Sequence, residues 1–317
     1  MAIYLTEEDV KTLLTMEVAL DSTEAMFVAK GEGNATNKPR YRVPFPSGSL
    51  QVMSASLPPL GVTGTKIYTS VKMQTLFHLY LYSSETGELL SIIEANTLGQ
   101  IRTGAATGIA TKYLSRKDCV SVGVIGCGYQ AKSQLVAVCQ VRNIKEIRAF
   151  SRDETKRSAF AHDMTVTLDV NVEPVESGEQ AVKDADILIT ITGSKSPVLE
   201  GEWIKAGSHI NAAGGNHWMR RELDQTAVRK SEIKVVDDLE QAKIECGDLI
   251  SLYERGAIRW EQVIELSHIV SGRLKGRQSQ EQVTLFESQG IALEDIAVGV
   301  RLHQLAVEKG IGLSLPS

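Results

Sequence analysis

The chain has 317 residues, of which 43% are hydrophobic and 23% charged, and its formal net charge is -5. This length favours two domains over one. The acidic balance argues against nucleic acid binding, which needs a basic surface, and no apolar run is long enough to cross a bilayer.

The cysteines and histidines predict neither a disulfide nor a metal site. The four cysteines show no CxxC spacing, and the six histidines show no HExxH motif or paired ligand spacing. We therefore assign them no chemistry and expect no metal. The first residues lack the basic segment and apolar core of a signal peptide, so we expect a cytoplasmic protein.

Residues 1–115 predict an α+β domain. A short strand leads to a helix that is N-capped at "TEED", residues 6–9. Alternating apolar runs follow at 48–57, 61–71 and 76–93, the last with a hairpin turn at "ETGE". Such runs indicate strands of a half-buried sheet.

From residue 116 to about 285, short β-rich runs alternate with helical segments, which predicts a doubly wound parallel sheet of the Rossmann type. The expected strands are 119–126, 146–150, 186–191, 208–213 and 233–238, and the expected helices are 131–142, 154–164, 177–185 and 221–231. After residue 285 come a strand-like piece and a long amphipathic helix. We expect this tail to have no place in the nucleotide sheet and to return to the first domain.

A glycine-rich loop follows the first strand of the parallel region and opens a helix. It reads GxGxxA, with these residues: Gly126, Cys127, Gly128, Tyr129, Gln130 and Ala131. The first glycine permits a tight turn, the second a close approach of the pyrophosphate, and the alanine close packing of helix and sheet. Because strand, loop and helix all agree, we favour a dinucleotide site at the helix N-terminus over a plain turn.

The end of the next strand bears on which dinucleotide is bound. An NAD enzyme places a carboxylate there against the ribose 2′-OH, whereas this chain has Ser151 and Arg152. A 2′-phosphate would find donors and a cation, so the sequence favours NADP(H), with NAD(H) possible. Asp153 is the alternative ribose ligand if the strand ends later than expected, and a solvated charge cluster is the other interpretation.

The motifs taken together resemble the ornithine cyclodeaminase and mu-crystallin family over nearly the full length. The resemblance is carried most specifically by "IRTGAATG…KYL" before the nucleotide strand and by "HINAAGG", and also by "NKPRYRVPF", "GVTGTKIY" and "VDDLEQAKIECGDL". It implies a Rossmann domain, 116–287, and a discontinuous substrate-binding and dimerisation domain, 1–115 completed by 288–317. It also implies hydride exchange at the α-carbon of an amino acid by a homodimeric enzyme.

The family's carboxylate-binding residues correspond to Arg40, Lys66 and Arg102. A guanidinium fixes the plane of a carboxylate through two hydrogen bonds, and a lysine adds a mobile charge that can also transfer a proton. Without the resemblance, each is a cation whose head group would ordinarily be solvated. Arg42 would share the face of Arg40, so either could fill that place.

Two positions depart from the cyclodeaminase pattern. Asn216 stands where the resemblance implies an aspartate that contacts the substrate amine, and Gln51 stands where the ornithine enzyme carries a glutamate. An amide can orient a nitrogen but cannot accept its proton as a carboxylate does. Two acidic partners for a diamine are therefore missing.

We accordingly predict an NAD(P)H-dependent imine reductase or amino-acid dehydrogenase, an oxidoreductase acting on C–N bonds of small amino or imino acids. Lys66 or a water would supply the proton, with Asn216 orienting the imine and His217 as an alternative donor. Weaker cofactor contacts are predicted at Thr192, Arg220 and Ser288. The alternatives are an ornithine or lysine cyclodeaminase with bound NAD and a non-catalytic NADPH-binding protein like mu-crystallin.

Overall fold

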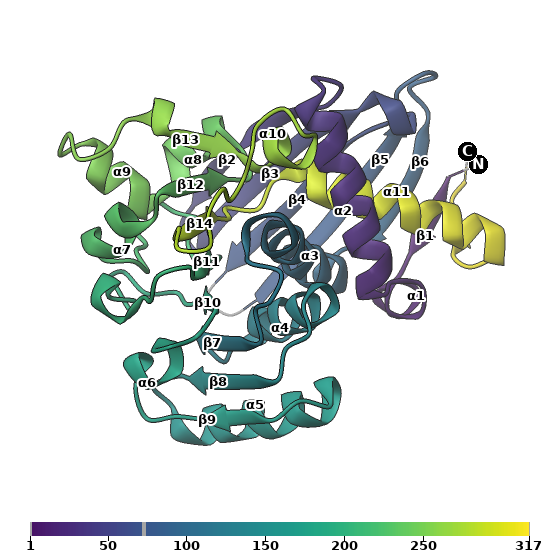
Figure 1. The fold of residues 1–317 in the computed structure, drawn as a ribbon. Helices are drawn as coiled ribbons and strands as arrows, with labels where there is room; N and C mark the ends of the chain where they lie inside the picture. Colours follow the sequence, from purple (N-terminus) through teal and green to yellow (C-terminus); the bar gives the residue numbers. More distant parts are fainter. Residues whose placement is uncertain (1, 72–73, 317) are drawn as a thin grey trace. The chain divides into compact units, whose positions relative to one another are not determined.

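A computed structural model describes residues 2–71 and 74–316, and the chain divides into two compact units (Figure 1). The first unit is Met1–Ala105 with Ile291–Ser317, and the second is Ala106–Gly290. The functional domain limits given above stay a prediction.

The first unit is built on a mixed sheet. Its strands, in the order in which they pair, are β15 (Leu313–Ser314), β1 (Ile3–Leu5), β6 (Leu89–Glu94), β5 (Gln74–Ser83), β4 (Val62–Val71), β3 (Gly48–Leu57) and β2 (Thr36–Phe45). Strands β1 and β6 pair in parallel, and the other described pairs are antiparallel. The alternating runs of the sequence thus form a half-buried sheet, as predicted.

Helices complete the first unit. They are α1 (Glu7–Leu13), α2 (Met16–Gly31), η1 (Pro58–Leu60), the first half of α3 (Asn96–Leu114) and α11 (Ala292–Lys309). Thr6 caps α1 through the predicted capping box with Asp9. Helix α11 packs against β3, β4 and α2 (Figure 1), and the residues of its first two turns are buried. The C-terminal tail therefore supplies part of the core of this unit.

The second unit is built on a sheet whose described strand pairs are all parallel. The strand order is β13 (Val263–Glu265), β12 (Ile233–Val236), β14 (Thr284–Glu287), β11 (His209–Ala212), β10 (Ile187–Thr190), β7 (Ser121–Ile125), β8 (Glu146–Phe150) and β9 (Val172–Pro174). The helices are α4 (Tyr129–Val141), α5 (Glu154–Leu168), α6 (Gly178–Val182), α7 (Gln225–Lys230), α8 (Leu239–Glu245), α9 (Gly247–Tyr253) and α10 (Leu266–Val270), with η2 (Gly201–Trp203) and η3 (Trp260–Gln262).

Two apolar clusters cover the two faces of this sheet. One joins side chains of α4 and α5, such as Leu135 and Phe160, to Val122 and Val124 of β7. The other joins side chains of α6, α7 and α9 to Leu188 of β10 and to other strand residues. Helices on both faces define a doubly wound sheet, so the predicted fold class is confirmed.

The expectation that the tail has no place in the nucleotide sheet is wrong for its first part. Residues Thr284–Glu287 form β14, which lies between β11 and β12 in the middle of the parallel sheet. Strands β9 and β13 were also missed, since each is only three residues long and short runs carry little periodicity. Only the helix of the tail belongs to the first unit.

The described part of the chain contains no helix with the length and hydropathy needed to cross a membrane. Over the same residues, no group of three or more His, Cys, Asp or Glu side chains is placed to hold a metal ion.

Candidate functional site

The glycine loop has the geometry that its sequence predicts. Gly126 has φ +115, which L side chains rarely adopt, and a Cβ there would lie 2.4 Å from the carbonyl oxygen of Ile191. A Cβ on Gly128 would meet no described atom within 4 Å. Ala131 is fully buried where α4 packs on the sheet. The loop thus packs against the protein at Gly126 and has free space beside it at Gly128.

Helix α4 begins directly at this open position. Gly128 is its N-cap residue, and no side chain among the described residues caps its first N–H groups. Tyr129 is 59% exposed, whereas Gln130 has a buried Oε1 without a hydrogen-bond partner in the described structure. The N–H groups and the positive dipole end at a helix start attract anions. A dinucleotide pyrophosphate fits the residues that are present.

The segment after β8 shows which groups can reach the ribose. Strand β8 ends at Phe150, so Ser151 and Arg152 follow it directly, as predicted. Asp153 is the N-cap of α5, and its carboxylate accepts a hydrogen bond from the backbone N–H of Lys156 at 3.0 Å. This capping role lowers the pKa of Asp153, chiefly through that backbone hydrogen bond. One carboxylate oxygen of the alternative ribose ligand therefore serves the helix cap.

Arg157 fixes the same segment from within α5. Its Nη1 donates to the carbonyl oxygen of Ser151 at 2.8 Å, and its guanidinium carbon lies 5.7 Å from the centre of the Phe150 ring. Arg157 is buried, whereas Arg152 is exposed. Arg152 is therefore the better placed of the two for an outside phosphate.

The strand order changes direction between β10 and β7. From β7 the chain adds β8 and β9 on one side, and it then returns to place β10 on the other side of β7. In doubly wound sheets, ligands bind outside the carboxyl ends of the strands at such a point. Both the glycine loop after β7 and Thr192 after β10 lie there. The hydroxyl of Thr192 donates to Glu222 at 2.7 Å, so its proton is already directed inward.

The loop after β11 carries the other predicted residues of this unit. Asn216, His217 and Arg220 are each partly buried in it. His217 Nδ1 accepts a hydrogen bond from the backbone N–H of Met219 at 3.2 Å, which makes it part of the loop's own turn. Arg220 Nη1 donates to the carbonyl oxygen of Gly214 at 3.4 Å. Ser288 follows β14, is buried, and lies 3.5 Å from Asp237 Oδ2.

A separate set of buried charges lies in the first unit. Lys66 Nζ donates to Asp295 Oδ2 at 2.7 Å, and Arg102 Nε donates to Asp295 Oδ1 at 3.0 Å. Arg102 Nη1 also donates to Glu294 Oε2 at 2.5 Å. All four side chains are at most 7% exposed. We call Lys66, Arg102, Glu294 and Asp295 the buried charge cluster.

The electrostatics of this cluster affect its two cations differently. Burial lowers the pKa of Lys66 to about 7, assisted by the charge of Arg102 and opposed by that of Asp295. Burial opposes the charge on Arg102 as well, but Asp295 and Glu294 outweigh it and raise the pKa of Arg102. Lys66 can therefore exchange a proton near neutral pH, while Arg102 stays charged.

The remaining predicted substrate residues lie in strands of the same unit. Arg40 is buried in an irregular part of β2, close enough for its charge to lower the pKa of Lys66, whereas Arg42 is less buried. Gln51 Nε2 donates to Ser70 Oγ at 2.8 Å. Residues 51 and 53 of β3 pair with residues 68 and 66 of β4, so Gln51 shares the face of Lys66.

Sequence reasoning missed the acidic members of both sites. Glu294 and Asp295 stand in the first turn of α11, where acidic residues ordinarily serve the helix dipole. Glu222 stands at the start of the expected helix 221–231, where it was given no role of its own. The sequence shows each of these residues only as a carboxylate next to apolar core positions. That pattern does not distinguish a buried acidic residue from one on the surface.

Comparison with known proteins adds to this geometry. Residues 2–310 match the family model described as "Ornithine cyclodeaminase/mu-crystallin family". The chain belongs to the ornithine cyclodeaminase/mu-crystallin family. The resemblance predicted from its motifs is thus confirmed.

Several members of this family are similar over nearly the whole chain. Alanine dehydrogenase of Archaeoglobus fulgidus is 35% identical, with 98% of this chain and 97% of that protein covered. The structure of Thermococcus litoralis Δ1-pyrroline-2-carboxylate reductase in complex with NADH and L-proline has TM-score 0.94 and 34% identity, covering 99% and 100% of the two chains. An archaeal alanine dehydrogenase dimer with bound NAD has TM-score 0.93 and 34% identity, covering 99% of both. These relatives carry names of the predicted class, oxidoreductases acting on imines or amino acids.

Proposed function

We propose that this protein is an NAD(P)H-dependent reductase of small α-imino acids that also catalyses the reverse oxidation of the amino acid. The observation that carries this proposal is the buried Lys66, held by Asp295 beside Arg102. It combines cations suited to a carboxylate with an ammonium that can release a proton near pH 7.

The chain's own residues would act as follows. Arg102, kept charged by two carboxylates, and the buried Arg40 would bind the substrate carboxylate. Lys66 would deliver a proton to the reacting substrate from its Nζ. The glycine loop and the start of α4 would hold the pyrophosphate of a dinucleotide, which supplies the hydride when bound. The predicted role of Asn216, orientation of the imine nitrogen, stays a prediction.

We also propose that NADPH is preferred to NADH, and that the working enzyme is a homodimer. Ser151 and Arg152 follow β8 directly, and Oδ1 of Asp153 serves the cap of α5, which supports a 2′-phosphate site. The dimer is supported by the archaeal alanine dehydrogenase.

The test is a substrate panel assayed with the purified protein and either dinucleotide. We expect oxidation of NADPH, and more slowly of NADH, with Δ1-pyrroline-2-carboxylate, Δ1-piperideine-2-carboxylate or pyruvate with ammonia. Ornithine should release no ammonia. Release of ammonia and proline from ornithine with catalytic NAD would instead establish a cyclodeaminase. Tight dinucleotide binding without turnover of any substrate would establish a binding protein.

A further inference from the structure

Glu222 is a fully enclosed carboxylate whose hydrogen bonds join separate segments of the second unit. It is 1% exposed. Oε1 accepts from the backbone N–H and the hydroxyl of Thr192, at 2.6 and 2.7 Å. Oε2 accepts from the hydroxyl of Thr190 at 3.0 Å and from the backbone N–H of Gly214 at 2.8 Å. One side chain thus connects the end of β10 to the loop after β11.

These segments border the point where the strand order changes direction. Thr192 follows β10, and the glycine loop follows the adjacent strand β7, where the position of a Gly126 Cβ lies 2.4 Å from the oxygen of Ile191. The residues held by Glu222 therefore lie next to the proposed pyrophosphate loop. Glu222 itself is too deeply buried to touch a bound dinucleotide.

The loop after β11 is fixed tightly around the same carboxylate. A Cβ on Gly214 would lie 2.2 Å from the oxygen of Thr192 and 2.6 Å from Glu222 Oε1, so only glycine fits there. Asp248 in turn accepts from the backbone N–H groups of Glu222 and Leu223, at 3.1 and 3.0 Å. Glu222 is therefore held at its backbone as well as at its carboxylate.

We propose that Glu222 is a positioning residue for the dinucleotide: through Thr192 and Gly214 it sets the wall of the crevice at the carboxyl ends of β7 and β10. This inference rests on the proposed function, because it assumes that the crevice binds NAD(P)H. Its consequence is that changing Glu222 weakens cofactor binding beyond any effect on folding.

Glu222→Gln is the informative substitution because it conserves shape. Each carboxylate oxygen accepts from one backbone N–H and one threonine hydroxyl, so whichever oxygen becomes an amide NH₂ faces an N–H that can only donate. The hydroxyl can turn to accept, but the hydrogen bond from the backbone N–H is lost. The backbone N–H of either Thr192 or Gly214 is then left without its acceptor. We expect the Kd for NADPH to rise about tenfold, since hydrogen bonds to charged groups are the stronger ones.

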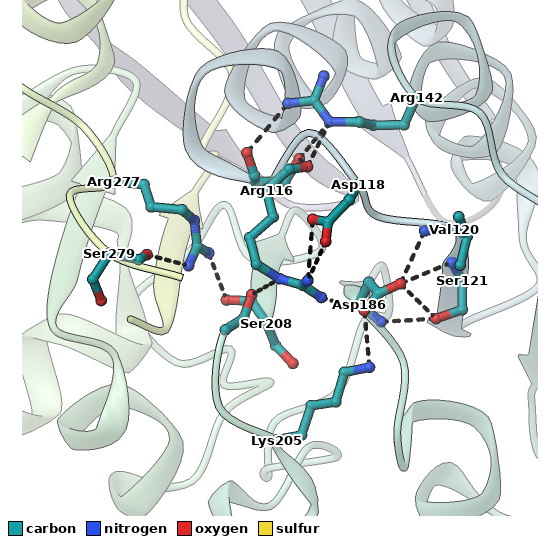
Figure 2. A network of polar contacts seen from close by, with 12 residues as sticks. Arg116, Asp118, Val120, Ser121, Arg142, Asp186, Lys205, Ser208, Arg277 and Ser279 are labelled. Carbon is teal, nitrogen blue, oxygen red and sulfur yellow. Dashed lines mark hydrogen bonds and ion pairs between the residues drawn. The ribbon is translucent and has the colours of Figure 1, made fainter. Parts of the chain in front are cut away.

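Asp186→Asn is the matched control. Asp186 precedes β10 at its amino end, the end opposite to Thr192, and is buried like Glu222. Figure 2 shows its carboxylate bound by Arg116, Lys205, Val120 and Ser121. Loss of the Asp186 carboxylate should destabilise the same sheet but leave the wall of the crevice unchanged.

The experiment measures Kd for NADPH and NADH by fluorescence and the thermal unfolding midpoint of the wild type and both variants. We expect both variants to unfold earlier, but only Glu222→Gln to bind the dinucleotide about tenfold more weakly. A Kd within about twofold of wild type in folded Glu222→Gln, or an equal rise in Asp186→Asn, would overturn the inference alone. Failure of the wild type to bind either dinucleotide would overturn the proposed function and this inference with it.

Thr190→Val provides a second route if Glu222→Gln does not fold. It removes only the hydroxyl that donates to Glu222 Oε2 and conserves the buried volume. We expect a rise of about threefold in Kd, consistent with the loss of one hydrogen bond. An unchanged Kd in this folded variant would also overturn the inference.

Discussion

Lys66 Nζ lies 2.7 Å from Asp295 Oδ2, although 229 positions separate the two residues in the sequence. The strand β4 and the first turn of α11 bring them together inside the first unit. Asp295 also accepts from Arg102, so a single carboxylate sets the positions of both cations. The C-terminal helix is therefore part of the candidate site as well as of the core.

Lys66 should limit the reaction at alkaline pH. Burial lowers its pKa to about 7, and the ammonium form is the one that can donate a proton, so kcat/KM for imine reduction should fall above about pH 7. Lys66→Met should lower kcat by about 10²- to 10⁴-fold, the usual contribution of a general acid. A variant with wild-type kcat and pH profile would exclude Lys66 as the donor.

Asp295→Asn should shift the fall of kcat/KM at alkaline pH to lower pH. Asp295 raises the pKa of Lys66 against burial and the charge of Arg102, so its neutralisation lowers that pKa further. The measurement is the pH dependence of kcat/KM. Glu94→Gln is the control, because Glu94 binds Tyr4 and the backbone of Glu7 instead, and its profile should match wild type. A fall of kcat/KM at the same pH in Asp295→Asn as in wild type would contradict the account.

Arg102→Leu should destabilise the first unit strongly. It leaves Glu294 buried without its cation, and breaking a buried ion pair typically costs about 3–5 kcal/mol. The double variant Arg102→Leu/Glu294→Leu should recover part of this loss, since the uncompensated carboxylate is gone. Denaturant unfolding of the three proteins tests both statements. Equal stability of wild type and Arg102→Leu would show that the cluster is not coupled in this way.

The two loop glycines should respond differently to alanine. Gly126→Ala forces a side chain into a positive φ and against the oxygen of Ile191, so it should lower the unfolding midpoint. The methyl of Gly128→Ala meets no atom within 4 Å among the described residues beyond its chain neighbours. The unfolding midpoint should therefore stay near wild type while the methyl occupies the space proposed for phosphate. We expect its Kd for NADPH to rise more than about tenfold. Unchanged binding in Gly128→Ala would argue against this loop as the pyrophosphate site.

Cofactor choice should depend on the two residues after β8. Ser151→Asp places a carboxylate against a 2′-phosphate, so NADPH binding should weaken at least about tenfold with NADH binding retained. Arg152→Ala should weaken NADPH binding selectively. Lys183→Ala removes an exposed cation that follows α6 and pairs with Glu179, and it should change neither Kd. Equal effects on both dinucleotides would remove the basis for an NADPH preference.

The parallel sheet and its glycine loop could be predicted because local patterns determine them. The run around β7, the GxGxxA spacing and the helical periodicity of α4 all lie within about twenty residues. Strand β14 was misplaced because its position depends on pairing with β11 and β12, which the tail's own sequence does not encode. Which distant segments pair as strands depends on how the whole core packs.

The cations of the candidate site could be named from the family motifs, whereas their acidic partners could not. Glu294 and Asp295 look like ordinary acidic residues of a helix start until α11 is seen to bury them. Glu222 gains its role only when β10 and the loop after β11 converge on its carboxylate. Electrostatic partners that are far apart in the sequence can thus be identified only once the fold is known.

The central claim is that hydride passes between a nicotinamide dinucleotide and the α-carbon of an imino acid. It is tested most directly by mass spectrometry of the product formed from NADPH deuterated at nicotinamide C4. With Δ1-pyrroline-2-carboxylate, or the imino acid of the panel that reacts fastest, one stereoisomer of the labelled cofactor should deliver its deuterium to Cα of the amino acid. An amino acid product without deuterium at Cα from either stereoisomer would contradict the account.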